Sequence, residues 1–325
     1  MNARTTTRIL SALVFLTLMT SAIGAAQLGS LSGPVLGYVF DKDAGRMRPV
    51  RGIPGSATVG VPIDSVAVAH VLSLDTNHVI ASSATSSELR VLSLSGSEAS
   101  SLVIPGAPAN PSRAAASRRG TAAAFYYADT HLFHVVTGLP TAPQTASIHQ
   151  LDGPVTQLAI NDDATLFLFA VSQEDGEALY SWSSASGNAT FVTSAGSISG
   201  LAITRNGDAI VTDRKADEVF AIWNAAGSAV RRLLADKTQG VSSPAGVVVS
   251  SDDRIYVGNA GSGTVTVLDA NGRFLNNPSC DCMLSGMFPL RDSLFRLTDR
   301  IDQTTFLLDA SAAEARIVFV PPPQE

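Results

Sequence analysis

The feature that most constrains this chain is an internal repeat of forty-odd residues that runs through much of its length. Each copy has a short apolar run, a polar turn and a second apolar run. In chain order the copies lie at 71–81, 113–126, 157–170, 200–213, 246–259 and 286–299. A fixed period of this length is typical of architectures in which each repeat is one supersecondary unit that packs against its neighbours.

Each copy is predicted to form two antiparallel strands around a tight turn. Asn206–Gly207, Asp162–Asp163 and Asp252–Asp253 are residue types that tolerate the backbone angles of hairpin turns. We give these turn residues no functional role. A second hairpin follows each copy, and 264–268 (TVTVL) shows the period of two expected for a half-buried strand. Four antiparallel strands in about 40–50 residues are the content of one β-propeller blade.

The number of blades is left open between two arrangements. The sequence contains six first hairpins but seven second hairpins, and the unpaired one is the N-terminal hairpin at 37–52. The ring then has either seven blades with an incomplete first blade, or six blades with an added edge hairpin. We predict an all-β fold, a β-propeller of four-stranded antiparallel blades, and favour seven blades.

The segment 244–269 (PAGVVVSSDDRIYVGNAGSGTVTVLD) resembles the repeat of NHL and YVTN propellers. It has their order of Pro, apolar run, polar turn, Tyr-Val, Gly-Ser-Gly, alternating strand and Asp. The copies at 198–223 and 154–182 match less fully, and the resemblance extends over 37–320. It implies the fold rather than a chemistry. It also implies that the first strand of each blade lines a central channel. The loops that enter this strand, and those that join the two hairpins, would share one ligand-binding face.

The N-terminus is predicted to be a secretory signal peptide covering 1–26. Arg4 and Arg8 precede an apolar stretch at 9–19, and small residues follow up to Ala26. The apolar stretch is shorter than the roughly 20 residues of a membrane span, although an uncleaved anchor is the alternative. We therefore expect a single propeller domain at 27–325, secreted or periplasmic, with no membrane span after cleavage.

Composition removes several function classes. Charged residues are 15% of the chain and the net charge is −6, so no basic stripe for nucleic acid exists. A hydrophobic content of 45% excludes intrinsic disorder. The two cysteines, Cys280 and Cys282, are too few for a disulfide scaffold. In an oxidising compartment they can pair with each other, and two free thiols or a redox pair are the alternatives.

The innermost strands offer little chemistry. They are expected at 114–116, 158–160, 201–203 and 247–249, and consist of Ala, Leu, Ile and Val, which fill a narrow channel. Related propeller lactonases hold a cation with carboxylates and amides from several blades, and these strands carry almost none. His131 and His134 are three apart on an expected strand, so they point to opposite faces. We predict no catalytic residue, no metal and no cofactor.

Polar residues cluster instead in the loops of the expected ligand face. Three precede or begin first strands: Asp64, Arg113 and Gln157. Six lie between hairpins: Asp129, Asp213, Arg214, Asn259, Asp299 and Arg300. They are predicted to form a polar rim for a ligand or partner, and solvated loops with weak local ion pairs are the alternative. If the rim binds, replacing Asp213 and Asp299 by Ala should reduce binding with little change in stability.

The function predicted from the sequence is an exported scaffold that binds a small molecule or a protein. A rigid propeller presents loops from several blades on one face, so recognition needs only loop variation. The alternative is a metal-dependent, lactonase-like hydrolase or lyase that uses the same channel mouth.

Overall fold

The repeat folds into sheets whose strands follow one another along the chain. The computed structural model describes residues 33–41, 45–63, 70–82, 86–95, 98–151, 153–291, 293–300 and 302–323. Within these ranges each strand of a sheet pairs antiparallel with the strand before it. The residues from Pro34 onward form one compact unit. The predicted signal peptide and Asp64 lie outside the described residues.

Seven sheets contain all the strands. The first has β1 (Val35–Asp41), β2 (Arg46–Ile53) and β3 (Ser56–Val59), and the second β4 (His70–Ser73), β5 (His78–Ser82), β6 (Glu88–Ser95) and β7 (Glu98–Pro108). The third has β8 (Arg113–Ala116), β9 (Ala123–Tyr127), β10 (Leu132–Thr137) and β11 (Gln144–Gln150), and the fourth β12 (Val155–Ile160), β13 (Leu166–Gln173), β14 (Gly176–Ser183) and β15 (Ala189–Ala195). The fifth has β16 (Ile198–Ile203), β17 (Ala209–Asp213), β18 (Glu218–Trp223) and β19 (Val230–Ala235), followed by the short 3-10 helix η1 (Lys237–Gln239). The sixth has β20 (Pro244–Val249), β21 (Ile255–Asn259), β22 (Thr264–Leu268) and β23 (Phe274–Asn276), and the seventh β24 (Phe288–Arg291), β25 (Leu294–Arg296), β26 (Thr305–Asp309) and β27 (Arg316–Val320).

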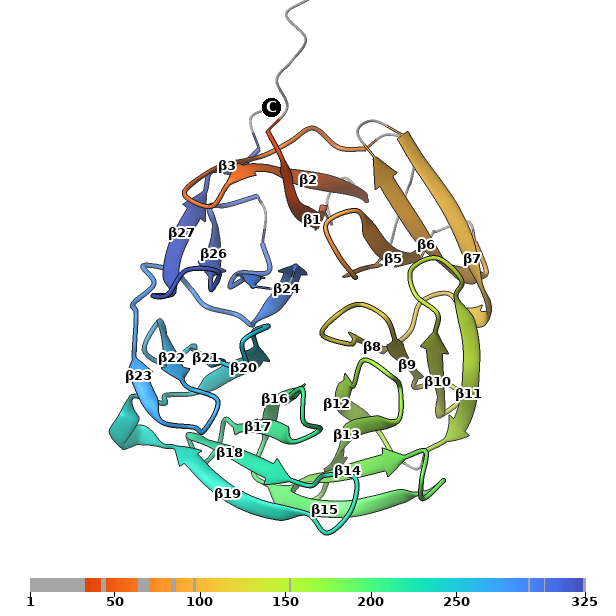
Figure 1. Ribbon diagram of the computed structural model, residues 1–325, viewed down its shortest axis with the longest axis vertical. Helices are drawn as coiled ribbons and strands as arrows, with labels where there is room; N and C mark the ends of the chain where they lie inside the picture. The colour runs from red at the N-terminus through yellow and green to blue at the C-terminus, as the bar shows by residue number, and fades with distance from the viewer. Residues whose placement is uncertain are drawn as a thin grey trace, which may run out of the picture. The chain divides into compact units, whose positions relative to one another are not determined.

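The sheets stand around a common axis, with the first strand of each innermost (Figure 1). Neighbouring innermost strands pack together: β8 against β12, β12 against β16, β16 against β20, and β1 against both β24 and β4. The protein is therefore a seven-bladed β-propeller. This confirms the predicted all-β fold, the favoured blade number and the incomplete first blade, which has three strands.

The N-terminal hairpin has a different place from the one predicted. The sequence analysis took 37–52 as an unpaired outer hairpin, but β1 is the innermost strand of blade 1 and β2 lies outside it. Inner and outer hairpins have the same strand lengths and the same alternation, so only the contacts between blades distinguish them. Blade 1 consequently lacks its outermost strand rather than its inner pair.

Glycine recurs in the repeat because the innermost strands approach one another closely. A Cβ at Gly200 would lie 2.7 Å from the amide nitrogen of Val247 and 2.9 Å from the Cα of Gly246. A Cβ at Gly246 would lie 3.2 Å from the amide nitrogen of Met287 in the next blade. Backbone atoms cannot move aside as a flexible side chain can, so side chains at these positions would push the blades apart.

Tight turns join the first two strands of each blade much as predicted. Gly207 and Asp253 adopt positive φ angles of 82° and 61°. In blade 4 the positive φ falls one residue later than the predicted pair, at Ala164 (56°). There Asp163 accepts hydrogen bonds from the amide and the hydroxyl of Thr165. These short turns all lie at one end of the innermost strands, because each strand pair is antiparallel.

The ring closes where blade 1 meets blade 7. Leu36, Val39 and Val50 of blade 1 are buried with Leu290 and other apolar side chains of blade 7. A Cβ at Gly37 would lie 3.1 Å from the Cβ of Leu290, so the two innermost strands are nearly in contact there. Blades 1 and 7 each consist of consecutive strands, so packing of side chains holds the two ends of the chain together.

We expect Leu290→Ala to destabilise the protein by roughly 2–5 kcal/mol, because it leaves a cavity at the closure of the ring. The measurement is the free energy of unfolding from urea denaturation. Val230→Ala is the control, since Val230 is 55% exposed on β19 and its loss should change stability by less than about 0.5 kcal/mol. Equal effects of the two variants would contradict the role given to the closure.

His134 is buried on β10, with its ring edge-on to Tyr127 at a centroid distance of 4.9 Å. His131, predicted on the same strand, lies instead in the preceding turn with a φ of 55°. Burial lowers the pKa of His134 below its usual value, and the Gly106 carbonyl only partly offsets this. The folded protein therefore keeps His134 neutral at pH values where the unfolded chain protonates it.

The unfolded state then binds more protons than the folded state below the usual histidine pKa of 6.5. Stability contributed by neutral His134 is present above that pH and is lost as the pH falls toward the lowered pKa. Between about pH 7 and pH 5, the melting temperature of His134→Phe should fall less than that of the wild type. Thermal unfolding across this range measures it, and parallel pH profiles would contradict it.

Candidate functional site

The innermost strands enclose a cavity of about 680 Å³. Its walls include the segments predicted from the sequence, 114–116, 158–160, 201–203 and 247–249, which consist of Ala, Leu, Ile and Val. These four segments give part of the channel an apolar wall. Serine and threonine residues, together with Arg118 and Arg291, also line the cavity.

We name the end at which the chain enters the innermost strands the linker mouth. Three of the predicted rim residues, Arg113, Gln157 and Arg214, line the cavity there. Arg113 begins β8, Gln157 is near the start of β12, and Arg214 directly follows β17. They come from blades 3, 4 and 5, so the rim prediction brings together residues that are far apart in sequence.

Backbone carbonyls of neighbouring blades hold both arginines in place. Nε of Arg113 donates to the Thr156 carbonyl at 3.0 Å, and one terminal nitrogen donates to the Ser112 carbonyl at 2.9 Å. Nε of Arg214 donates to the Pro244 carbonyl at 3.2 Å. Within the described residues the terminal nitrogens of Arg214 have no acceptor, so its fork of donors is available to a ligand.

Glu177 also lines the linker mouth, and the sequence analysis missed it. It is the second residue of the third strand of blade 4, and its carboxylate accepts a hydrogen bond from the Ile198 amide at the start of blade 5. The signal was available: residues 174–177 (EDGE) lie where the chain passes between two hairpins, as the predicted rim residues do in other blades.

Asp213 is buried and has a structural role. Its carboxylate accepts hydrogen bonds from the amides of Gly196 and Ser197, before β16, and from those of Lys215 and Ala216, after β17. The distances lie between 2.7 and 3.2 Å. Four donors saturate the carboxylate, so it joins the linker to the turn instead of facing a ligand.

Asn259 has the equivalent role in blade 6. It is fully buried; its carbonyl oxygen accepts from the Ser242 amide at 3.2 Å, and its amide donates to the Thr266 hydroxyl at 2.9 Å. Both Asp213 and Asn259 end the second strand of their blade. A polar residue at this repeat position therefore binds the linker that precedes the blade. From the sequence alone, such a residue cannot be distinguished from a polar residue that faces a ligand.

The other predicted rim residues that the structure describes, Asp129, Asp299 and Arg300, do not line the cavity. Asp129 is exposed in the turn between β9 and β10. The Asp299 carboxylate lies 3.5 Å from the guanidinium of Arg296, and Arg300 pairs with Asp302. Asp213–Arg214 and Asp299–Arg300 thus both lie between the second and third strands of their blades, but their surroundings differ.

Cys280 and Cys282 are joined in a disulfide before blade 7. Cys280 is buried in the core between blades 6 and 7, and its amide donates to the Gly263 carbonyl at 2.7 Å. In the described part of the chain, no group of three or more His, Cys, Asp and Glu side chains is arranged to hold a metal ion. No helix in the described ranges is long and apolar enough to cross a membrane.

Comparison with known proteins supports the fold alone. No protein-family model matches the chain, and no curated protein matches it. Among solved structures it is similar to a streptogramin B lyase, with a TM-score of 0.57 and 10% identity over 90% of each chain. Virginiamycin B lyase from Staphylococcus aureus has a TM-score of 0.52 and 12% identity, covering 85% of this chain and 91% of that one. A chain of a nidogen/laminin complex has a TM-score of 0.50 and 13% identity, covering 77% of this chain and 95% of that one. Enzymes and an interaction protein thus share this fold, and at these identities the likeness assigns no activity.

We expect Asp213→Ala to lower the free energy of unfolding by roughly 1–3 kcal/mol, because it leaves partly buried amides without an acceptor. This replaces the sequence-based expectation that the change leaves stability intact. Asp129→Ala removes an exposed carboxylate from a turn in blade 3, and its effect should stay below about 0.5 kcal/mol. Urea denaturation compares the two, and a stable Asp213→Ala protein would restore the rim interpretation.

Proposed function

We propose that this protein is an exported, ligand-binding β-propeller that takes an amphipathic small molecule at the linker mouth. The apolar body of the ligand lies in the channel, and an anionic or carbonyl head contacts Arg113 and Arg214. Export rests on the N-terminal segment 1–26, whose sequence is that of a secretory signal peptide.

The observation that carries the proposal is the contrast between the channel and its rim. A cavity of about 680 Å³ is within the usual size of small-molecule sites. The wall segments 114–116, 158–160, 201–203 and 247–249 are apolar, while Arg113 and Arg214 are exposed at the rim and tethered by backbone carbonyls. Apolar walls with a few positioned polar groups are the common design of ligand pockets.

The alternative from the sequence, a metal-dependent lactonase-like hydrolase or lyase, requires carboxylates and amides of several blades around a cation. Among the described residues, the charged and amide groups gathered at the linker mouth are two guanidinium groups, the amide of Gln157 and the carboxylate of Glu177. That carboxylate already accepts the Ile198 N–H. This set favours an anionic head group over a cation, and so supports binding.

The experiment uses 8-anilinonaphthalene-1-sulfonate, which carries an apolar ring system and one anionic group. We expect saturable fluorescence enhancement with the purified protein. Arg113→Ala combined with Arg214→Ala should weaken binding at least about tenfold, because two charge-assisted contacts are lost. Ala114→Phe should block the channel, since Ala114 is exposed on its wall.

Arg232→Ala is the matched control, because it removes the same charge from the outermost strand β19. There the Cζ of Arg232 lies 4.9 Å from the ring centroid of Trp223. Thermal unfolding of all variants establishes that they remain folded. Binding that survives both the double substitution and the blocked channel would refute the proposed site.

A further inference from the structure

A second cavity, of about 910 Å³, lies at the opposite end of the channel, where tight turns join the first two strands of the blades. We name this end the turn mouth. Leu74, Arg118 and Arg291 line both cavities, so they mark where the channel opens into it. The described lining also has hydroxyl groups: Thr76, Ser251, Ser293 and Ser311. The sequence analysis gave the turn residues on this side no function.

Among the residues that the structure describes, four arginines and three aspartates line the turn mouth: Arg118, Arg119, Arg205, Arg291, Asp75, Asp162 and Asp309. Each aspartate is already engaged within the protein. Asp75 accepts from the amide and ring Nδ1 of His78, and Asp162 lies 3.6 Å from Arg118 and accepts from the Arg119 amide.

Asp309 is held by residues of its own blade. It accepts from the amide and hydroxyl of Ser311 and pairs with Arg316, which is not part of the cavity lining. The negative charges at this mouth are therefore matched mainly by groups other than Arg119, Arg205 and Arg291.

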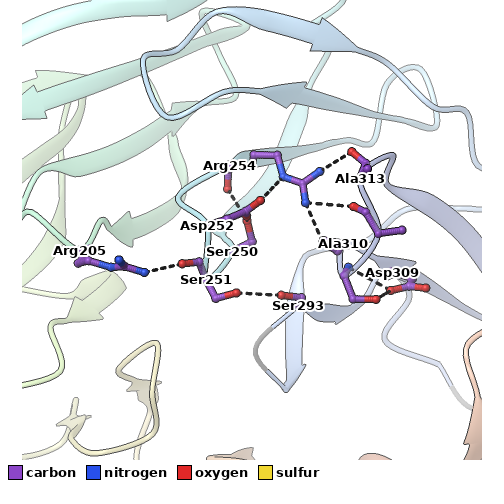
Figure 2. Close-up of polar contacts among 11 residues, drawn as sticks. Arg205, Ser250, Ser251, Asp252, Arg254, Ser293, Asp309, Ala310 and Ala313 are labelled. Atoms are coloured by element: carbon purple, nitrogen blue, oxygen red, sulfur yellow. Dashed lines mark hydrogen bonds and ion pairs between the residues drawn. The ribbon is translucent and has the colours of Figure 1, made fainter.

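Figure 2 shows two arginines on this side of the molecule, Arg254 and Arg205, which differ in how many protein acceptors their guanidinium groups contact. Arg254 pairs with Asp252 at 2.6 Å and donates to the carbonyls of Ala310, Ala312 and Ala313, so its donors are largely used in joining blades 6 and 7. Arg205 donates to the Ser251 carbonyl at 2.6 Å, and its Nε forms a long ion pair with the Asp253 carboxylate at 3.9 Å. Arg205 thus keeps most of its hydrogen-bond donors available to a ligand.

Arg119 and Arg291 have no hydrogen-bond or ion-pair partner for their guanidinium groups among the described residues. Together with Arg205 they belong to blades 3, 5 and 7, so three alternate blades direct cations to one cavity. Like charges around one cavity repel one another unless an anion lies between them. We propose that the turn mouth binds a compact polyanion through Arg119, Arg205 and Arg291.

The chemistry of the lining sets the class of ligand. Guanidinium groups bind carboxylate and phosphate oxygens in bidentate pairs, and the Thr76 hydroxyl supplies a further donor. Cations from three directions select a molecule with several anionic groups over one with a single charge. The ligand is therefore a small polycarboxylate or a molecule with linked phosphates. This site is at the other end of the channel from the linker mouth and is independent of the function proposed there.

The test is isothermal titration of the purified protein with citrate and, separately, with inorganic pyrophosphate at physiological salt. We expect one saturable site for at least one of them, and the two titrations show whether carboxylate or phosphate groups are preferred. Arg119→Ala and Arg291→Gln should each weaken binding at least about tenfold. Arg119 has no described partner to lose, so its substitution keeps the test valid even if an Arg291 variant fails to fold.

Two controls remove the same charge elsewhere. Arg232→Ala lies on an outermost strand, and Arg113→Ala lies at the linker mouth. Both should bind as the wild type does, so loss of polyanion binding is distinguished from failure of the other site. Absence of binding by both anions at millimolar concentration would overturn the proposal. Affinity unchanged in Arg119→Ala, or reduced equally by every arginine substitution, would overturn it as well, since the latter is non-specific attraction.

Discussion

Close packing between the innermost strands of neighbouring blades is the constraint on which the rest of this structure depends. A four-stranded sheet has two faces and cannot bury both by itself, so each blade is stable only between two others. At Gly200 and Gly246 the backbones come so near that a single Cβ would meet main-chain atoms. At the closure of the ring, Gly37 and Leu290 approach one another just as closely, and apolar side chains of blades 1 and 7 pack together around them.

This packing decides where polar chemistry is possible. Small and branched apolar residues form four of the innermost wall segments of the channel, because they fill the narrow space between closely packed strands. Charge therefore collects at the two mouths, and the two differ. The linker mouth has two tethered arginines, an amide and a carboxylate, while the turn mouth has arginines directed inward from alternate blades.

Polar residues at equivalent repeat positions divide into those that hold blades together and those that face a cavity. Asp213 and Arg254 use nearly all their hydrogen-bonding capacity on backbone groups. Arg119 and Arg214 come from the same kinds of loop but keep donors free toward a cavity. The number of partners, and not the residue type, separates the two roles.

The sequence by itself determined the all-β propeller fold and the apolar innermost segments, and it favoured seven blades over six, because strand alternation, turn residues and repeat period are local properties of the chain. Three residues that the sequence singled out, Arg113, Gln157 and Arg214, line one mouth. Only the tertiary structure decided that 37–52 is an inner hairpin, that Asp213 and Asn259 are buried, and that Glu177 lines the linker mouth. It also brought Arg119, Arg205 and Arg291 to one cavity. These properties depend on contacts between blades, and a repeat pattern places residues within a blade without stating which neighbours satisfy their hydrogen bonds and charges.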